Sequence, residues 1–399
     1  MSEFVKLSQV AKYSNSRIEA SNLTLENFIS IDNILPNKEG IKIASGLPPG
    51  RSAVPAFEKN NILIGNIRPY LKKIWLANSG GGCSADVLNL EVREGYDPKF
   101  IYYALFRDDF FIHMMKGAKG TKMPRGDKSH ILEFLIPNFE INLQKKIVEV
   151  LSSIDQKIEI NRRIIEQLEG LSKTIYGYWF EQFEFPNHSN KPYRSSGGAM
   201  TWSEELKRSV PVGWQIGNLL DIAEFQNGLA CQRYRPNGGD SLRVIKIKEM
   251  NEGFSKNTEL VRATVPSKII IENGDILFSW SASLDVIMWA GGKGALNQHI
   301  FKVSSSEYPK FYYYYELVNY LSHFKMMAEN RKTTMGHITQ EHLQQSRILI
   351  PPVALLKQLE KILEPNLSKI ILLKAEIFEL SSLRDWILPL LMNQQVQIH

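Results

Sequence analysis

The chain has 399 residues, 43% of them hydrophobic and 23% charged, a composition typical of folded proteins at a length that suits two or three domains. It has no apolar run of the ~20 residues that span a bilayer and no secretory pattern at its start, so we expect a cytoplasmic protein without a membrane partner. Its only two cysteines are far apart in the sequence, so we expect neither a disulfide framework nor a cysteine zinc site. A formal net charge of +6 favours a polyanionic partner.

Residues 1–140 have the pattern of a mixed α/β domain. Short apolar or β-branched runs bounded by Gly, Asn or Asp predict strands, among them NILIGNI and VLNLEV. The segment PKFIYYALFRDDFFIHMMK has aromatic residues at helical spacing, and we assign that stripe to core packing. Residues 215–351 repeat these features, with strands predicted at RVIKIKEM, DILFSW and HIFKV and a helix at PKFYYYYELVNYLSHFKMMA.

Residues 141–182 predict one long helix between these domains. Steps of four and three residues define the seam of a coiled coil: Ile147, Leu151, Ile154, Ile158, Asn161, Ile165 and Leu168. The alternative is a core helix of a bundle, but a single long stripe requires one partner helix rather than a surrounding core. Residues 183–214 are rich in Pro, Gly, Ser and Asn and predict a linker.

Residues 352–399 supply the partner helix. Their seam contains Ile370, Leu373, Ile377 and Leu380. Pro365 should kink or start this helix, so we expect its regular part to begin at about Leu367. An antiparallel pairing of the two long helices is the arrangement we expect.

The chain also contains an internal duplication. VKLSQVAKY at 5–13 matches GNLLDIAEF at 217–225, DPKFIYYAL at 97–105 matches YPKFYYYYE at 308–316, and Leu168 corresponds to Leu380. Because all the matches have offsets between 211 and 214 residues, each half is one globular domain followed by one long helix.

Basic residues gather in loops of both halves, where Gly-containing backbone can approach phosphate closely and Arg, Asn or Gln can contact base edges. Taken singly, each is more often a solvated charge, but their occurrence at matching places favours a shared binding surface. The candidate DNA-binding residues are Arg68, Lys72, Lys73, Lys119, Lys122, Arg125, Lys128, Gln232, Arg233, Arg235, Asn330, Arg331, Lys332 and Thr333.

Enzyme signatures are mostly missing from the sequence. GTKMPRGDKS has the wrong spacing for a phosphate-binding Walker loop, and the chain has no dinucleotide fingerprint, no zinc motif and no Asn-Pro-Pro-aromatic tetrapeptide. We therefore predict no catalytic, cofactor-binding or metal-binding residue in this chain. Asp86 and Glu91 leave open a metal-dependent nuclease pair, although carboxylates at that spacing are common on surface strands.

Three segments together carry a family resemblance: the domain opening VPVGWQIGNLLDIAEFQNG, the connector FEFPNHSNKPYRSSGGAM and the helix entry IPNFEINLQKKIVEVLSSIDQKIEINRRIIEQLEGL. Over essentially its full length the chain resembles the specificity subunit of a type I restriction–modification system. The resemblance implies two target-recognition domains that read a bipartite, asymmetric site in double-stranded DNA. It also implies two methyltransferase subunits docked on the paired helices, and restriction subunits that join later. S-adenosylmethionine, ATP and Mg²⁺ are expected in those partners and not in this chain.

In this interpretation the long helix sets the distance between the half-sites. Residues 147–179 would span roughly 50 Å at 1.5 Å per residue, or roughly 14 base pairs of DNA. Four residues inserted between Glu166 and Gly170 should lengthen the unread spacer and leave both half-sites unchanged. The alternatives are a stand-alone DNA nuclease or modification enzyme, and a coiled-coil scaffold that joins two protein-binding domains.

Overall fold

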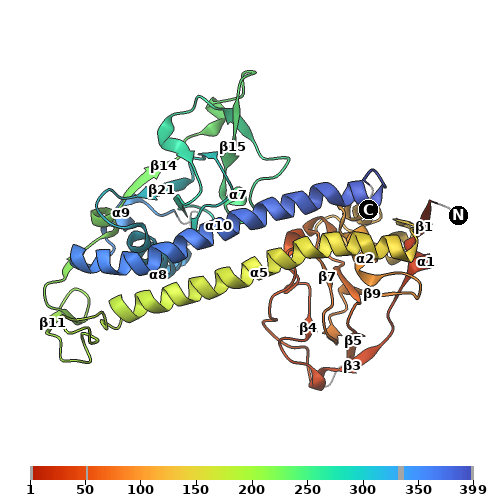
Figure 1. Cartoon of the computed structure of the whole chain (residues 1–399), viewed down its shortest axis with the longest axis horizontal. Coiled ribbons are helices and arrows are strands. Elements are labelled where there is room, and N and C mark those ends of the chain that lie inside the picture. The colour runs from red at the N-terminus through yellow and green to blue at the C-terminus, as the bar shows by residue number, and fades with distance from the viewer. Residues whose placement is uncertain (1–2, 51–52, 331–336, 397–399) are drawn as a thin grey trace. The chain divides into compact units, whose positions relative to one another are not determined.

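The computed structural model describes residues 3–50, 53–330 and 337–396. It contains two compact units, Met1–Gln156 with Ser381–His399, and Lys157–Leu380. Both boundaries fall inside the long helices α5 (Ile141–Phe180) and α10 (Val353–Met392), so each unit combines one globular domain with a part of each helix (Figure 1). None of the helices in the described ranges has both the length and the apolar character needed to cross a bilayer.

The first unit has a helical layer, an inner sheet and an outer sheet. Every neighbouring pair in the inner sheet is antiparallel, in the order β2 (Ala11–Tyr13), β9 (Val87–Val92), β6 (Ile62–Gly65) and β7 (Ile74–Leu76). Side chains of β6 alternate between two cores, as the strand period requires. Ile62 and Ile64 pack in the core with the helices, whereas Leu63 packs with Phe57 and Cys83 of the outer sheet.

The remaining elements of this unit complete the two outer layers. The outer sheet has the order β3 (Arg17–Glu19), β5 (Ala53–Phe57), β8 (Gly81–Cys83) and β4 (Phe28–Ile29). A further pair joins β1 (Phe4–Lys6) to β10 (Leu135–Pro137). The helices are α1 (Leu7–Val10), α2 (Pro98–Phe106), α3 (Asp108–Lys116) and α4 (Lys128–Ile131). The helix expected over PKFIYYALFRDDFFIHMMK is therefore two helices, because Arg107 between them has extended backbone.

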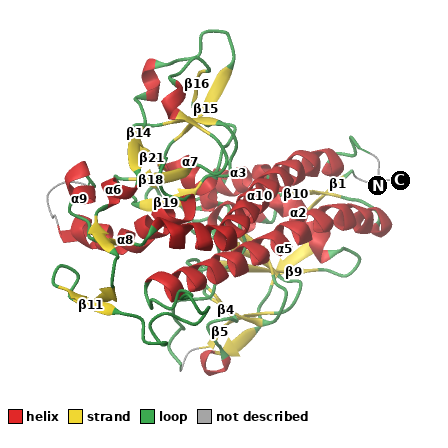
Figure 2. Cartoon of the chain, turned by 60° about the vertical axis from the view of Figure 1, so that its left-hand side comes forward, coloured by secondary structure: helices red, strands yellow, loops and turns green. Residues whose placement is uncertain are grey.

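The second unit repeats this architecture (Figure 2). Its inner sheet has the order β14 (Glu224–Asn227), β21 (Ile300–Ser304), β18 (Ile276–Ser279) and β19 (Asp285–Met288), again antiparallel throughout. The outer sheet has the order β16 (Leu260–Arg262), β15 (Ser241–Ile245), β20 (Gly294–Leu296) and β17 (Ile270–Ile271). The pair β13 (Gln215–Gly217) and β22 (Ile348–Ile350) matches β1 and β10. The helices are α6 (Leu219–Ile222), α7 (Ile247–Glu252), α8 (Lys310–Asn330) and α9 (Gln340–Gln344).

The two outer sheets differ at one edge strand. In both, a central strand (β8 or β20) has one parallel and one antiparallel neighbour. The fourth strand joins a different neighbour of the central strand in each sheet. In the first unit β3 pairs with β5, the antiparallel neighbour, and in the second unit β16 pairs with β15, the parallel neighbour. The inner sheets therefore share one topology, and the outer sheets carry the difference between the domains.

One predicted strand is only half correct. RVIKIKEM forms strand β15 as far as Ile245, but its second part is helix α7. The Glu249 carboxylate accepts a hydrogen bond from the backbone N–H of Lys246 at 3.2 Å, which caps the start of this helix. The apolar run was short enough for this local capping to end the strand.

The long helices pair in opposite directions, which confirms the antiparallel prediction. In the first unit, Ile147 and Leu151 of α5 share a core with Leu388 and Leu391 of α10. Two polar contacts set the register in the second unit: the Asn161 amide donates to the Glu376 carboxylate at 2.8 Å, and the Asn366 amide donates to the Ser172 hydroxyl at 3.1 Å. The predicted seam residues are all at least half-buried: buried Ile147, Leu151, Ile158, Asn161, Ile165, Ile370 and Leu373, and half-buried Ile154, Leu168, Ile377 and Leu380.

The expected interruption at Pro365 is wrong. Helix α10 runs without a break from Val353 to Met392 and includes Pro365. Pro365 is exposed, as is Lys361, whose carbonyl loses its intrahelical hydrogen bond at this point. Because this face is open to solvent, water can bond that carbonyl, and the buried seam on the other face keeps the helix continuous.

The segment predicted as a linker is folded. Residues 183–214 contain the antiparallel hairpin β11 (Met200–Ser203) and β12 (Arg208–Pro211). Phe183, Phe185 and Val210 are buried in the main core of the second unit, and Phe185 stacks on Trp214 with ring centroids 5.5 Å apart. The Gly- and Ser-rich composition indicated a loose segment, but its aromatic residues provide enough apolar surface to anchor it.

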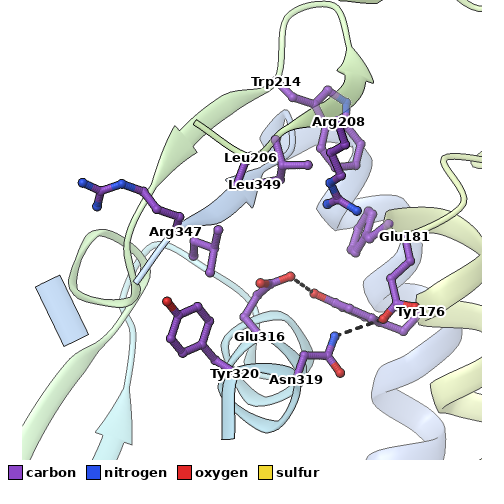
Figure 3. A pocket seen from close by; sticks show the side chains of 12 residues that line it. Tyr176, Glu181, Leu206, Arg208, Trp214, Glu316, Asn319, Tyr320, Arg347 and Leu349 are labelled. Carbon is purple, nitrogen blue, oxygen red and sulfur yellow. Dashed lines mark hydrogen bonds between the residues drawn. The ribbon is translucent and has the colours of Figure 1, made fainter. Parts of the chain in front are cut away.

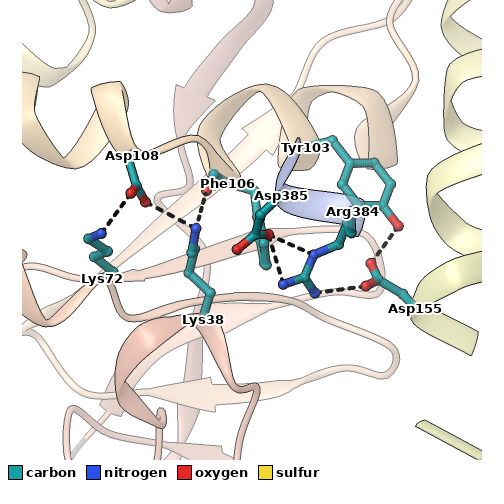
Figure 4. A network of polar contacts seen from close by, with 8 residues as sticks. All are labelled: Lys38, Lys72, Tyr103, Phe106, Asp108, Asp155, Arg384 and Asp385. Carbon is teal, nitrogen blue, oxygen red and sulfur yellow. Dashed lines mark hydrogen bonds and ion pairs between the residues drawn. The ribbon is translucent and has the colours of Figure 1, made fainter. Parts of the chain in front are cut away.

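In the first unit, a polar network attaches the domain to both long helices (Figure 4). The Arg384 guanidinium of α10 forms an ion pair with Asp155 of α5 at 2.9 Å, and the Tyr103 hydroxyl of α2 donates to the same carboxylate at 2.7 Å. Arg384 also lies 4.5 Å from the ring centroid of Phe106, and the Lys38 ammonium lies 4.7 Å from the same centroid. One carboxylate and one ring thus fix the orientation of α2 against the helix pair in this unit.

Candidate nucleic-acid interface

The two basic loops predicted in the first half lie side by side. One follows β6 and contains the short helix η3 (Pro69–Leu71), and the other joins α3 to α4. The backbone N–H of Arg68 donates to Pro124 O at 2.8 Å, and the N–H of Gly126 donates to Asn66 O at 3.2 Å. Arg68 has a left-handed backbone conformation, with φ of 53°. The structure therefore joins Arg68 to the loop containing Lys119, Lys122 and Arg125.

The second of these loops is a narrow hairpin with a basic rim. Lys119 and Arg125 exchange backbone hydrogen bonds in both directions, each of 2.9 Å. The side chains of Lys119, Lys122, Arg125 and Lys128 are exposed. Carboxylates orient two of them, since Lys119 pairs with Asp127 at 2.9 Å and Arg125 pairs with Asp86 at 3.0 Å.

Asp127 ties this rim to α4. Its carboxylate accepts hydrogen bonds from the Lys119 ammonium and from the backbone N–H groups of Ser129 and His130, which caps α4. The Lys119 hydrogen bond and these backbone N–H groups lower the pKa of Asp127 to about 2. The carboxylate is therefore charged at neutral pH and connects the hairpin to the first turn of α4.

Two residues of the first unit that were predicted to bind DNA instead form contacts within the domain. Lys72 is half-buried and pairs with Asp108 at 2.9 Å. Lys73 is half-buried, donates to the carbonyl of Ile31, and has its pKa lowered by burial. These contacts orient the loop, and they leave Arg68, Lys119, Lys122, Arg125 and Lys128 as its exposed cations.

The second unit has the same pair of loops. The backbone N–H of Ile338 donates to Trp280 O at 2.9 Å, and the internal duplication matches these residues to Gly126 and Asn66. Ala282, the counterpart of Arg68, has the same left-handed conformation with φ of 59°. The Trp280 ring lies 5.6 Å from the ring of His299 and 5.5 Å from that of His337. The same backbone frame thus carries cations in one domain and an aromatic cluster in the other.

Several predicted residues of this loop cannot be placed. Arg331, Lys332 and Thr333 lie outside the described residues, as does the side chain of Asn330, whose backbone ends α8. Gln232 and Arg233 lie in the short helix η4 (Cys231–Arg233) and are exposed, as is Arg235.

Two further arginines of the second unit, Arg243 and Arg262, were not predicted from the sequence. In the pair β15–β16, Leu242, Val244 and Val261 pack in the core, so Arg243 and Arg262 lie on the opposite face. The Arg262 guanidinium lies 5.4 Å from the Tyr234 ring and that of Arg243 lies 5.4 Å from the Phe254 ring. Strand alternation in SLRVI and LVR was the signal that could have identified both.

The described residues offer little for catalysis. In the described ranges, no group of three or more His, Cys, Asp and Glu side chains is placed to hold a metal ion. Asp86 pairs with Arg125, and Glu91 pairs with Lys12 at 3.2 Å. Both cysteines are buried free thiols, and burial raises the pKa of Cys83 to about 12 and that of Cys231 to about 11. Such thiols are poor nucleophiles at neutral pH.

Comparisons with known proteins agree with the duplicated architecture. The family model described as the type I restriction modification DNA specificity domain matches twice, over residues 2–170 and 211–381. The type I restriction enzyme MjaIX specificity subunit of Methanocaldococcus jannaschii is 24% identical over 356 residues, which cover 86% of this chain and 79% of that protein. The HindI specificity subunit of Haemophilus influenzae is 21% identical over 416 residues, covering 87% and 89%.

A solved structure shows the same fold. The crystal structure of the S subunit of a type I restriction–modification system from M. genitalium aligns with a TM-score of 0.57 at 17% identity, covering 97% of this chain and 95% of that one. Two matches to the family model, each comprising one domain and the helix that follows it, account for the internal duplication. The chain therefore belongs to the family of type I restriction–modification DNA specificity subunits.

Proposed function

We propose that each domain reads one half of a split, asymmetric DNA site with its pair of tied loops. The observation that carries this proposal is the backbone hydrogen bond that joins the two loops in both domains, from Gly126 to Asn66 and from Ile338 to Trp280. The frame is common to the two domains, but the side chains that it presents differ. Two domains with one frame and different side chains suit two different half-sites.

In this proposal, different side chains contact the base edges and the phosphates. Exposed Lys119 and Lys122 supply sequence-independent phosphate contacts, and Arg68 and Arg125 supply the bidentate donors that read guanine. In the second domain, Arg243 and Arg262 join Arg233 and Arg235 as candidates for the same roles.

We further propose that this chain performs no catalysis and recruits the subunits that do. Methyltransferase subunits that hold S-adenosylmethionine, and restriction subunits that use ATP and Mg²⁺, would supply the chemistry. The long helices expose large apolar side chains away from their shared seam: Ile160, Leu171, Ile362 and Leu372 in the second unit, and Leu383 and Trp386 in the first. The exposed fractions of Leu372 and Trp386 reach 65% and 64%. Apolar side chains exposed to this extent support a docking face for partner subunits.

The proposed reading is tested by replacing one cation of the rim. In the complex with the cognate methyltransferase subunit, Arg125→Ala should weaken binding to the cognate site by about 1–3 kcal/mol and relax specificity within one half-site only. Lys59→Ala is the matched control, because Lys59 is exposed in the same unit at the opposite end of β6. Binding titrations against oligonucleotides that vary one half-site at a time measure both effects. Equal losses on every oligonucleotide would assign Arg125 to phosphate, and no loss would contradict this interface.

Cleavage of DNA by the purified chain alone with a divalent metal ion would contradict the proposed non-catalytic role.

A further inference from the structure

The second unit contains a cavity of about 320 Å³ beside the end of α5 (Figure 3). Four parts of the chain line it: Tyr176 of α5 with Glu181 just after that helix, Arg208 and Trp214 of the connector 183–214, Glu316 of α8 and Leu349 of β22. None of the loops assigned to DNA contributes to this lining, so the cavity requires a separate account.

An incompletely bonded carboxylate faces this cavity. The Tyr176 hydroxyl donates to Oε1 of Glu316, and Oε2 has no hydrogen-bond partner within the described ranges. Burial raises the pKa of Glu316 to about 7, and the charge of Glu181 acts in the same direction. A carboxylate in this state gains strongly from a cationic hydrogen-bond donor, because such a donor offsets its lost hydration.

The internal duplication shows that the fold does not need this polar pair. Helices α5 and α10 each have 40 residues, and the same sequence offset separates their first residues and their last residues. Leu388 is therefore the counterpart of Tyr176 in the duplication. In the match of DPKFIYYAL with YPKFYYYYE, Leu105 is the counterpart of Glu316. Leu105 and Leu388 are 0% and 2% exposed in one core of the first unit. An apolar pair therefore suffices at this junction, and the polar pair in the second unit serves something other than packing.

The remaining lining suits the side chain of a basic residue. Aromatic rings of Tyr176, Phe180, Trp214 and Tyr320 form the walls, which can hold an aliphatic stem and attract a cation through their faces. Glu181 adds a second carboxylate, oriented by the Asn319 amide at 3.2 Å.

Neither arginine in the lining forms an ion pair with Glu316 within the described ranges. Arg347 pairs with Glu205 at 3.4 Å, and its guanidinium points away from Glu316 (Figure 3). Arg208 faces the cavity, is exposed and lies 5.2 Å from the ring of Phe183. Its charge acts on Glu316 from a distance and lowers the pKa of that carboxyl, so an entering cation competes with this exposed side chain.

The hairpin that carries Arg208 also exposes apolar side chains. Trp202 pairs with Ser209 and so lies on the face of the hairpin opposite Arg208, where it is 57% exposed, and Val212 next to the hairpin is 56% exposed. Apolar side chains exposed to this extent on an element that lines the cavity favour a protein partner over a free small molecule.

We propose that this pocket receives an arginine or lysine side chain of the methyltransferase subunit, whose cationic group pairs with Glu316 while its stem lies between the aromatic walls. The proposal deepens the proposed function and rests on it, since it presumes that such a subunit docks on this chain.

Isothermal titration of the methyltransferase subunit into the full chain at pH 7 tests the proposal. Entry of a cation makes Glu316 release its proton, so the heat should depend on the ionisation enthalpy of the buffer. Glu316→Gln should abolish the proton released by Glu316 and weaken assembly by at least about 30-fold. The double variant Tyr176→Leu/Glu316→Leu, which copies the pair in the first unit, should fold as stably as the wild type and assemble as weakly. Glu252→Gln, an exposed carboxylate on α7 outside the cavity lining, is the control.

The outcomes separate the two levels of inference. Wild-type assembly without proton release, or unchanged affinity in the double variant, would overturn the pocket proposal and leave the proposed function intact. A wild-type chain that does not assemble with the methyltransferase subunit would contradict both.

Discussion

The pH dependence of stability in the second unit follows from the half-buried carboxyl of Glu316. Its pKa is raised from 4.5 to about 7 in the folded chain, chiefly by burial. Between these two pH values the folded state holds the proton more tightly than the unfolded state, so the free energy of unfolding falls as pH rises through this window and levels off above it. A shift of this size corresponds to at most about 3 kcal/mol.

The assay is urea denaturation at several pH values from 4.5 to 8, with hydrogen exchange of the α8 amides as a local readout. Arg208 and Glu181 also face this carboxyl, so the wild-type curve alone is not sufficient. Glu316→Gln keeps the shape of the side chain and removes its titration. Subtracting the variant curve from the wild-type curve should leave a decline of up to about 3 kcal/mol across the window. Parallel curves for the two proteins would refute the reasoning.

Three further substitutions have definite expected outcomes. Arg384→Met should lower the free energy of unfolding by about 2–3 kcal/mol because it leaves a half-buried carboxylate without its ion pair, whereas the exposed control Arg163→Met should change it by less than about 0.5 kcal/mol; thermal and urea unfolding compare them. Gly126→Ala places a Cβ 2.8 Å from Oδ1 of Asn66 and 2.9 Å from Cδ1 of Ile131, so both side chains must shift where the two loops are tied, and methylation sequencing should show weakened discrimination in one half-site while the other stays intact. Asn161→Leu removes a buried amide oxygen without a hydrogen-bond partner in the described chain, and it also removes the hydrogen bond to Glu376, whose partly exposed carboxylate water can solvate instead. The substitution should therefore raise the free energy of unfolding by about 1 kcal/mol in urea titrations, provided that α5 and α10 keep their register.

Much of the architecture could be predicted because it depends on repeated patterns. The seam spacing predicted both long helices. The polar seam residues Asn161 and Ser172 form hydrogen bonds across the interface with Glu376 and Asn366, respectively. Regular periodicity is visible in one sequence because each turn repeats the same requirement.

Features set by tertiary contacts could not be predicted. Pro365 is accommodated because its helix face is exposed, and the connector folds because Phe183 and Phe185 find a core supplied by distant residues. Neither feature can be predicted from the composition of the surrounding segment. Of the candidate site, the sequence indicated the basic loops, and strand alternation could have indicated Arg243 and Arg262, but the ion pair of Lys72 depends on Asp108, a residue far along the chain.

The assignment of one half-site to each domain is tested most directly by a genome-wide methylation map of cells that express this chain with its cognate methyltransferase subunit. The expected result is methylated adenine in one split, asymmetric motif with a constant gap. Replacing residues 1–140 with another recognition domain should then change one half of the motif and preserve the other half and the gap. A change in both halves, or methylation without a split motif, would contradict the account.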